Sequence, residues 1–278
     1  MSEKLQKVLA ARGLGSRREI ETWIKAGRIQ VNGKNATLGD RVNATDTICV
    51  DGKRLKKQPV ENPVRVLMYN KPEGEICTRS DPEGRKTVFA SLPPLKGERW
   101  VSIGRLDINT SGLLLFSNHG ELANKLMHPS SGIDREYSVR VHGQVDEEML
   151  QRLKEGVLLD DGPASFSDIV PGESKGANRW FTVVLLEGRN REVRRLWESQ
   201  GVEVNRLKRV RFGPVFLPSY LKPGQYLELE HPQIADLFWQ AGLPEPDTYR
   251  PSPQERENRQ RRLKKLRSGA GKTRSRKH

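Results

Sequence analysis

The sequence contains little cysteine and no long apolar run, and these absences exclude several classes of protein. Its 278 residues include two cysteines, Cys49 and Cys77, too few for a disulfide framework and not spaced as a C-x-x-C pair. No window approaches the ~20 apolar residues that a membrane-spanning helix requires. The first residues lack the apolar core of a signal peptide. We therefore expect a cytoplasmic protein with no membrane partner.

Motifs for common cofactors are also absent. The chain has no G-x-x-x-x-G-K-[ST] phosphate loop and no G-x-G-x-x-G motif after a strand-like segment. Its five histidines are scattered, without the spacing of a metal site: His119, His128, His142, His231 and His278. We therefore expect neither a cofactor nor a metal.

Positive charge is in excess and is concentrated at the two ends of the chain. The formal net charge is +14. Residues 1–56 hold 12 Lys and Arg against 6 acids, and residues 251–278 hold 11 against 2, so the middle of the chain is near neutral. Basic appendages on a neutral body indicate polyanion binding. Basic tails that only aid solubility are the alternative.

The first 60 residues predict a small domain of two helices and short strands. Apolar residues at helical spacing within 5–9 predict the first helix, and Ser16 is a typical N-cap for the second. Asn-Gly at 32–33 and Asp-Gly at 51–52 predict hairpin turns. Cations on and after the second helix remain available to RNA, or merely to solvent: Arg17, Arg18, Lys25 and Arg28.

Residues 63–243 predict a larger domain, separated from the first by a polar linker at 56–63 that contains two prolines. Strand-like segments are 65–69, 100–103, 113–117, 136–141, 165–170, 179–186, 204–210 and 226–230. Helix-like segments are 87–91, 121–127, 146–155, 191–200 and 232–240. Strands outnumber helices without a strict β-α-β repeat, which favours an α+β fold with a mixed or antiparallel sheet.

The C-terminal segment, residues 244–278, forms a basic tail. Its last 28 residues, 251–278, contain two leucines but no aromatic side chain. Such a segment buries too little apolar surface to offset its ordering entropy, so we expect it to be disordered.

One short segment, GRLDINTSG at 104–112, points to chemistry. It places a single carboxylate, Asp107, in a polar loop between two apolar runs. Loops held between strands commonly carry catalytic side chains, because the rigid sheet fixes their position. The alternative is that Asp107 only caps a turn or neutralises Arg105.

With the residues that follow, GRLDINTSGLLL resembles the active-site motif of the bacterial ribosomal RNA pseudouridine synthases of the RsuA group. The likeness reaches residue 242 and is closest to members that act on large-subunit RNA. It includes GELANKLMHPS, REYSVRV, EGRNREVRRLWE and an N-terminal segment similar to the S4 RNA-binding module, KVLAARGLGSRREIETWIKAGRIQVNGK. The resemblance implies a bent mixed or antiparallel central sheet flanked by helices, plus a small S4-like RNA-binding domain.

The resemblance also implies roles for individual residues. Asp107 would be the catalytic carboxylate, and Tyr137 the aromatic ring that stacks on an extruded uracil. Strand alternation alone leaves a core position open for Tyr137. Arg105 would fill the place of the flipped nucleotide or grip its backbone. Many relatives have Lys where this chain has Arg135, which puts substrate contacts in doubt.

The arginine-rich segment 189–211, with eight cations against three acids, would supply a cation for the site. Arg194 matches the family position, and Arg191 and Arg195 share a helical face with it. One arginine would pair with Asp107 while its neighbours hold phosphates. A solvated basic helix is the alternative.

The implied activity is cofactor-free isomerisation of a specific uridine to pseudouridine in 23S ribosomal RNA. Three routes stay open: attack of Asp107 on the sugar C1′, removal of a ribose proton to give a glycal, and attack on the base. Two alternatives stay open as well: a non-catalytic RNA-binding or ribosome-assembly factor, and the same chemistry on small-subunit rRNA or tRNA. We expect a monomer, because no heptad repeat is present.

Overall fold

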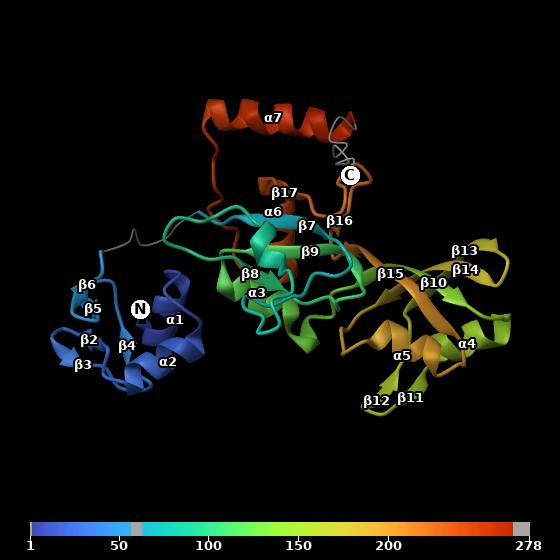
Figure 1. Cartoon of the computed structure of the whole chain (residues 1–278), viewed down its shortest axis with the longest axis horizontal. Helices are drawn as coiled ribbons and strands as arrows, with labels where there is room; N and C mark the ends of the chain where they lie inside the picture. Colours follow the sequence, from blue (N-terminus) through green and yellow to red (C-terminus); the bar gives the residue numbers. More distant parts are fainter. Residues whose placement is uncertain (1, 57–62, 269–278) are drawn as a thin grey trace.

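The computed structural model describes residues 2–56 and 63–268, which form two domains with separate apolar cores (Figure 1). The predicted linker, 56–63, falls almost wholly outside the described residues. No helix within 2–56 and 63–268 has the length and apolar character needed to cross a membrane.

The N-terminal domain packs two helices, α1 (Leu5–Ala11) and α2 (Arg17–Lys25), beside short strands. The predicted N-cap of α2 is confirmed. Ser16 Oγ accepts from the Glu19 N–H at 3.1 Å, and the Glu19 carboxylate accepts from the Ser16 N–H at 2.6 Å. The strands are β1 (Glu3–Lys4), β2 (Ile29–Val31), β3 (Lys34–Asn35), β4 (Arg41–Val42), β5 (Ile48–Val50) and β6 (Lys53–Arg54).

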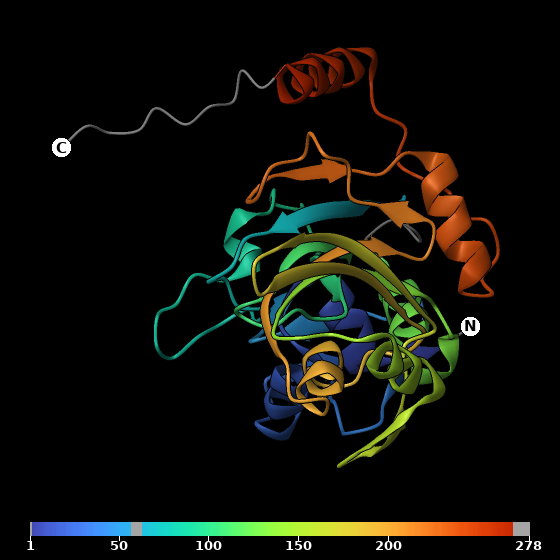
Figure 2. The same cartoon turned by 90° about the vertical axis from the view of Figure 1, so that its right-hand side faces the viewer.

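The larger domain is built on one curved sheet (Figures 1 and 2), in the order β13-β14-β10-β15-β9-β7-β17, with β16 beside β15 and β8 beside β9. Its strands are β7 (Val66–Lys71), β8 (Val101–Ile103), β9 (Ser111–Ser117), β10 (Arg135–His142), β13 (Asp168–Lys175), β14 (Asn178–Leu185), β15 (Glu203–Phe212), β16 (Val215–Phe216) and β17 (Tyr226–Glu228). The pairs are antiparallel except β9 with β15. The predicted mixed sheet is confirmed.

The parallel contact between β9 and β15 joins two antiparallel halves of the sheet, and it requires a glycine. Arg209 lies opposite Gly112 at this join. Gly112 has φ +101°, and a Cβ there would lie 2.2 Å from the Arg209 carbonyl oxygen. Glycine meets both the conformational and the steric demand. The buried Arg209 guanidinium adds a bond across the join, from Nε to the Leu113 carbonyl at 2.7 Å.

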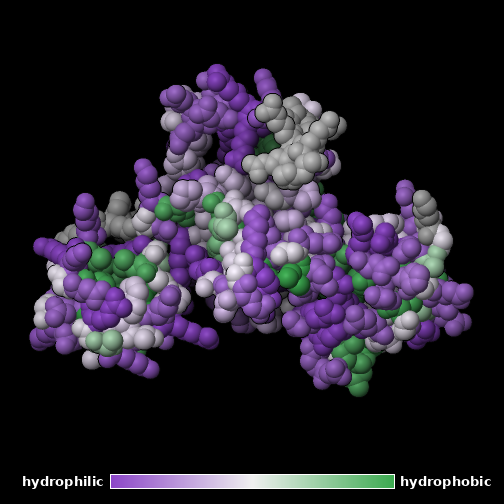
Figure 3. All heavy atoms as spheres, in the orientation of Figure 1, coloured by the Kyte–Doolittle hydropathy of each residue, from purple (hydrophilic) through white to green (hydrophobic). Residues whose placement is uncertain are grey.

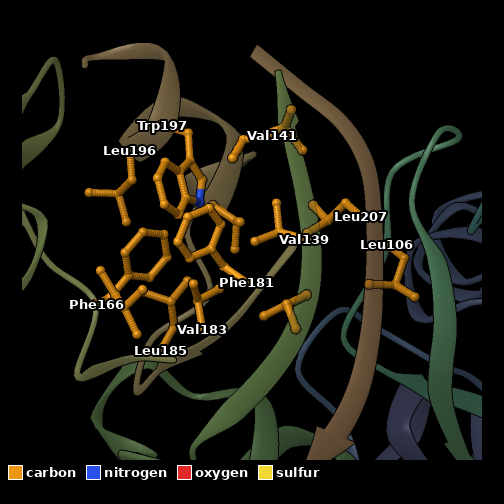
Figure 4. Close-up of a cluster of buried hydrophobic side chains, with 14 of the residues drawn as sticks. Leu106, Val139, Val141, Phe166, Phe181, Val183, Leu185, Leu196, Trp197 and Leu207 are labelled. Carbon is orange, nitrogen blue, oxygen red and sulfur yellow. The ribbon is translucent and has the colours of Figure 1, made fainter. Parts of the chain in front are cut away.

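Alternation along the strands creates an apolar layer on each face of the sheet. Leu114 and Phe116 of β9 belong to one layer, whereas Leu113 and Leu115 belong to the other. The first layer packs under α4 (Glu147–Glu155) and α5 (Glu192–Glu198), and the second under α3 (Gly120–Met127) and α6 (His231–Gln240). Figure 4 shows the rings of Phe166, Phe181 and Trp197 gathered beside Val139 of β10.

The predicted strands and helices of this domain are confirmed, with boundary shifts of a few residues. One predicted helix, 87–91, is instead a short 3-10 helix, η1 (Val88–Ser91). A second 3-10 helix, η2 (Pro129–Ser131), was not predicted, and neither were three short strands. Segments this short carry no clear periodicity. The strands are β11 (Val157–Leu159), β12 (Gly162–Ala164) and β16.

The predicted disorder of the C-terminal segment is wrong for most of its length. Residues Pro253–Arg267 form helix α7, and residues 269–278 lie outside the described residues. Ser252 and Glu255 form a capping box at its start, and proline occupies its first turn. The prediction counted apolar side chains only, whereas Leu266 and a set of arginines hold this helix to the body.

Helix α7 lies beyond the outer edge of β17 (Figures 1 and 2). Arg259 donates to the Glu228 carbonyl, and Arg262 donates to the Tyr226 carbonyl at 3.1 Å. These alternate carbonyls point away from β7, the partner of β17 on its other side. The Arg262 guanidinium also lies 4.1 Å from the Tyr226 ring centroid. The surface of α7 is strongly hydrophilic (Figure 3).

We predict that Gly112→Ala strongly destabilises the protein. The added methyl group meets the Arg209 backbone at a φ that L-residues disfavour, at a combined cost of roughly 3 kcal/mol or more. Thermal unfolding should then occur about 6–12 °C lower. The control is Gly224→Ala, whose φ is +80° but whose Cβ would meet nothing within 4 Å, so only the smaller backbone cost applies. Equal shifts for both variants would contradict the role of the close approach.

Candidate active site

Asp107 lies on the loop between β8 and β9, immediately before the join at Gly112. The loop turns through a hydrogen bond from the Thr110 N–H to the Asp107 carbonyl at 3.1 Å. The Asp107 side chain is half-buried, and its carboxylate makes no hydrogen bond or ion pair within 2–56 and 63–268. The loop therefore presents an unpartnered carboxylate at the bend of the sheet.

Lys71, the last residue of β7, holds this loop through its main chain. Its ammonium group is fully buried and donates to the carbonyls of Asp107 at 2.9 Å and Thr110 at 2.8 Å. It also reaches the carbonyls of Pro72 at 3.1 Å and Ile108 at 3.4 Å. Burial lowers the pKa of Lys71. This lysine fixes the position of the Asp107 loop.

This role of Lys71 was not predicted from the sequence. A lysine at the end of the apolar strand VLMYNK was the available signal. Lysine is almost never fully buried unless it is paired, so a lysine inside a core strand indicates a specific set of acceptors.

Arg194 holds the same loop from the other side. It is 5% exposed and donates to the carbonyls of Val204 at 2.8 Å and Asn109 at 3.0 Å. Burial and the charge of Arg191 lower the pKa of Arg194, and the charge of Asp107 opposes this. The expected direct ion pair with Asp107 is absent from the described residues, because the guanidinium is occupied by backbone carbonyls. Arg194 acts on Asp107 at longer range.

Tyr137 lies on β10, opposite Val183 of β14 and Arg209 of β15. It is 8% exposed and belongs to the same apolar layer as Leu106, the residue before Asp107. Its hydroxyl makes no hydrogen bond with the described part of the chain. The ring thus lies in the core layer next to the loop, with its hydroxyl unpartnered.

Arg135 is a structural residue in this chain. It is 7% exposed and donates to the carbonyls of Ile133 at 2.7 Å and Leu186 at 3.0 Å. Its guanidinium also lies 5.2 Å from the Phe212 ring. These bonds tie β10 to the end of β14 and leave little of the side chain for a substrate.

Arg105 is exposed, and its side chain has no hydrogen bond or ion pair among residues 2–56 and 63–268. The residue after it is fixed by Cys77, whose Sγ donates to the Leu106 carbonyl at 3.2 Å and lies 3.4 Å from the Leu106 nitrogen. Burial raises the pKa of the Cys77 thiol. The free arginine therefore projects from an anchored backbone.

The arginines of α5 do not form one surface. Arg191 is exposed and lies 3.4 Å from Glu198, whereas Arg195 binds both carboxylate oxygens of Asp161 at 2.8 Å. Arg194 points into the domain instead. Helical spacing correctly predicted that these arginines lie within one helical turn. It could not predict that Asp161, in the turn between β11 and β12, would bind Arg195.

The start of α5 is strained and encloses a buried acid. Arg191 has φ +50°, a left-handed conformation that costs a non-glycine residue about 1–2 kcal/mol. Glu192 is 3% exposed, and its Oε2 accepts from the Arg189 N–H at 2.9 Å. Burial, with a hydrogen bond to Glu187, raises the pKa of Glu192 to about 7. This turn sets the direction in which Arg194 leaves the helix.

The four cations predicted on the N-terminal domain are all exposed. Arg28 is held by Asp51 through bonds of 2.8 and 2.6 Å and lies 4.6 Å from the Trp23 ring. Arg17, Arg18 and Lys25 have no ion pair in the described part of the chain. These three are the ones available to a polyanion.

Comparisons with known proteins identify the family of the chain. Residues 65–199 match the family model for RNA pseudouridylate synthase, and residues 3–48 match the S4 domain. A relative from Salmonella typhi, named ribosomal large subunit pseudouridine synthase B, is 55% identical over 96% of this chain and 92% of its own length. The chain belongs to the RNA pseudouridylate synthase family.

Other relatives and a solved structure support this membership. A synthase of the same name from Pseudomonas aeruginosa is 60% identical over 87% of this chain, which spans 64% of that relative's length. The crystal structure of a pseudouridylate synthase matches 84% of this chain and 99% of its own, with a TM-score of 0.58 and 25% identity. The predicted family, fold and S4 domain are confirmed.

We predict that Lys71→Met lowers kcat about a hundredfold, with little change in RNA affinity. Methionine keeps the bulk but leaves the loop carbonyls without a donor, so Asp107 moves from its position, and small displacements have effects of this size. Activity and RNA binding should be measured together with thermal unfolding. The matched control is Lys222→Met, because Lys222 is exposed and binds one carbonyl at 3.2 Å. An unchanged kcat in folded Lys71→Met would refute the positioning role.

Proposed function

We propose that this synthase isomerises a specific uridine of large-subunit (23S) ribosomal RNA, with Asp107 acting on the nucleoside. The observation that carries the proposal is the unpartnered, half-buried Asp107 carboxylate on a loop fixed from two sides by Lys71 and Arg194. A carboxylate held in this way costs little reorganisation at the moment of reaction. The names of the relatives support the large subunit as the source of the substrate.

The reaction breaks the bond between C1′ and N1, turns the uracil and joins C1′ to C5. N1 takes up a proton and C5 loses one, so no atoms are gained or lost overall. The Asp107 carboxylate either attacks C1′ or removes a ribose proton to give a glycal, and both routes require its ionised form. Arg194 supplies positive charge within electrostatic range of Asp107.

Tyr137 and Arg105 would handle the extruded nucleotide. A ring at the position of Tyr137 can stack on uracil, a contact worth ~1–3 kcal/mol that offsets much of the unstacking cost. The Tyr137 hydroxyl can assist the transfer of the C5 proton away from the base. Arg105 projects from an anchored loop and can occupy the space that the nucleotide leaves in the RNA.

RNA binding would involve both basic appendages. Arg17, Arg18 and Lys25 offer unpaired cations on one helix, and the outward face of α7 carries Arg261, Lys264 and Lys265. Guanidinium and ammonium groups at these positions would hold the phosphate backbone without reading sequence. We further propose that the enzyme acts as a monomer in the cytoplasm.

We predict that Asp107→Asn lowers the rate of pseudouridine formation at least about a thousandfold while RNA affinity stays within a few fold. Asparagine keeps the shape but cannot supply the carboxylate. The measurement is tritium release from 5-tritiated uridine in transcribed rRNA, with RNA binding measured in parallel. The control Asp146→Asn changes an exposed acid outside the site and keeps a good N-cap for α4. Full activity in Asp107→Asn would exclude this mechanism.

The same assay separates the alternative functions. A non-catalytic assembly factor would bind rRNA without releasing tritium from it. Testing large-subunit rRNA, small-subunit rRNA and tRNA transcripts side by side identifies the substrate class. Tritium release confined to small-subunit rRNA or tRNA would contradict the proposed substrate.

We predict that replacing Arg261, Lys264 and Lys265 together by glutamine reduces the log-log salt slope of RNA binding by up to about 2–3 units. Each lost phosphate contact removes roughly 0.7–0.9 from the slope. Glutamine preserves helix propensity, so circular dichroism should not change. Deleting residues 269–278 alone serves as the comparison for the remaining basic segment. An unchanged slope in the triple variant would give α7 a role other than RNA binding.

A further inference from the structure

The two domains meet at a narrow, polar junction. Within residues 2–56 and 63–268, one hydrogen bond joins them, from Arg99 Nη1 to the Gly15 carbonyl at 2.8 Å. Next to it, Gly13 packs against Glu98, and a Cβ on Gly13 would lie 3.0 Å from the Glu98 carbonyl oxygen. The apolar core of the N-terminal domain consists only of residues of that domain. Such a contact is too small to hold the domains in one orientation.

Three arginines from the two domains gather at this junction. Arg99 binds the Gly15 carbonyl. Arg17, the first residue of α2, lies two positions after Gly15 in the sequence. Arg79 donates to the carbonyl of Trp100, the residue after Arg99, and lies 4.3 Å from the Phe89 ring centroid. Arg17 is exposed, and Arg79 is exposed over part of its surface while its guanidinium is partly buried.

These arginines repel one another. Burial lowers the pKa of Arg99, and the charge of Arg17 lowers it further. Burial and the charge of Arg99 likewise lower the pKa of Arg79. Arg17 and Arg99 belong to different domains, so the repulsion acts across the junction.

Little negative charge balances the cluster. Glu19 acts on both Arg79 and Arg99, but its carboxylate already accepts from the Ser16 N–H in the cap of α2. The Glu98 carboxylate turns away and accepts from Asn118 Nδ2 at 3.1 Å. Arg79 and Arg99 therefore share the charge of a single carboxylate, Glu19, while Arg17 adds a third positive charge next to Arg99.

We propose that Arg17, Arg79 and Arg99 form a composite site for one backbone phosphate of the RNA substrate, shared by the two domains. A phosphate supplies the missing negative charge, and the planar guanidinium forks match its oxygens. Bound between them, it would fix the N-terminal domain against the catalytic domain. The inference rests on the proposed RNA substrate and deepens it by naming where the RNA backbone bridges the domains.

The test is a double-mutant cycle on RNA affinity with Arg17→Gln and Arg79→Gln, two residues that no bond joins in the free protein. Each single variant should bind rRNA about tenfold more weakly, because a charge-assisted contact is lost. The double variant should lose much less than the hundredfold in affinity expected from two independent losses. Removing either arginine alone already releases the bridging phosphate. Arg99→Gln should show the same coupling to Arg17→Gln.

The control pair is Arg18→Gln with Arg79→Gln. Arg18 is the next cation on α2 and is equally exposed, but it lies outside the cluster, so its effect should add to that of Arg79→Gln. Additive losses for Arg17 and Arg79 would overturn the proposal. Thermal unfolding of every variant is measured in parallel, so that a loss of affinity caused by unfolding is recognised.

Two further measurements distinguish this inference from the proposed function and from binding of free phosphate. Tritium release by the original protein tests the proposed function separately from the binding cycle. Absent release from the original protein would defeat the proposed function while leaving the binding cycle interpretable. Coupling that persists in phosphate buffer of matched ionic strength supports an RNA phosphate. Coupling lost in that buffer would assign the site to free phosphate and overturn the RNA assignment.

Discussion

The close approach of β9 to β15 at Gly112 is the constraint on which the rest of the structure depends. Two antiparallel half-sheets meet there through a short parallel contact, with no room for a Cβ between Gly112 and the Arg209 backbone. The loop that carries Asp107 ends at this join, while Tyr137 on β10 lies across from Arg209. A single steric requirement thus brings the acid and the aromatic ring, which come from different halves, to the same bend.

The site is organised through backbone carbonyls rather than through its reactive group. Lys71 and Arg194 approach the Asp107 loop from β7 and α5, and both spend their hydrogen bonds on main-chain oxygens. Among residues 2–56 and 63–268 the carboxylate has no hydrogen-bond or ion-pair partner that a substrate would have to displace. Buried cations with neutral acceptors fix geometry and supply positive potential at the same time.

The sequence predicted well what depends on local patterns or on the family motif. The strands around 113–117 and 136–141 and the cap at Ser16 followed from alternation and cap chemistry. It could not predict what depends on distant partners. Asp161 captures Arg195 from a turn 34 residues away, and backbone oxygens occupy Arg194 in place of Asp107. Helix α7 was not predicted because the prediction considered only the burial of apolar side chains. Guanidinium contacts hold this helix against the domain.

Helix α7 has a consequence for how this molecule behaves among copies of itself. The free edge of β17 presents the carbonyls of Tyr226 and Glu228, which a foreign strand could use as a template. Arg262 and Arg259 donate to these same carbonyls, so the basic helix α7 lies along this edge. The basic helix thereby covers the β17 border of the nine-stranded sheet without adding a strand to it, and leaves β13 as the other border.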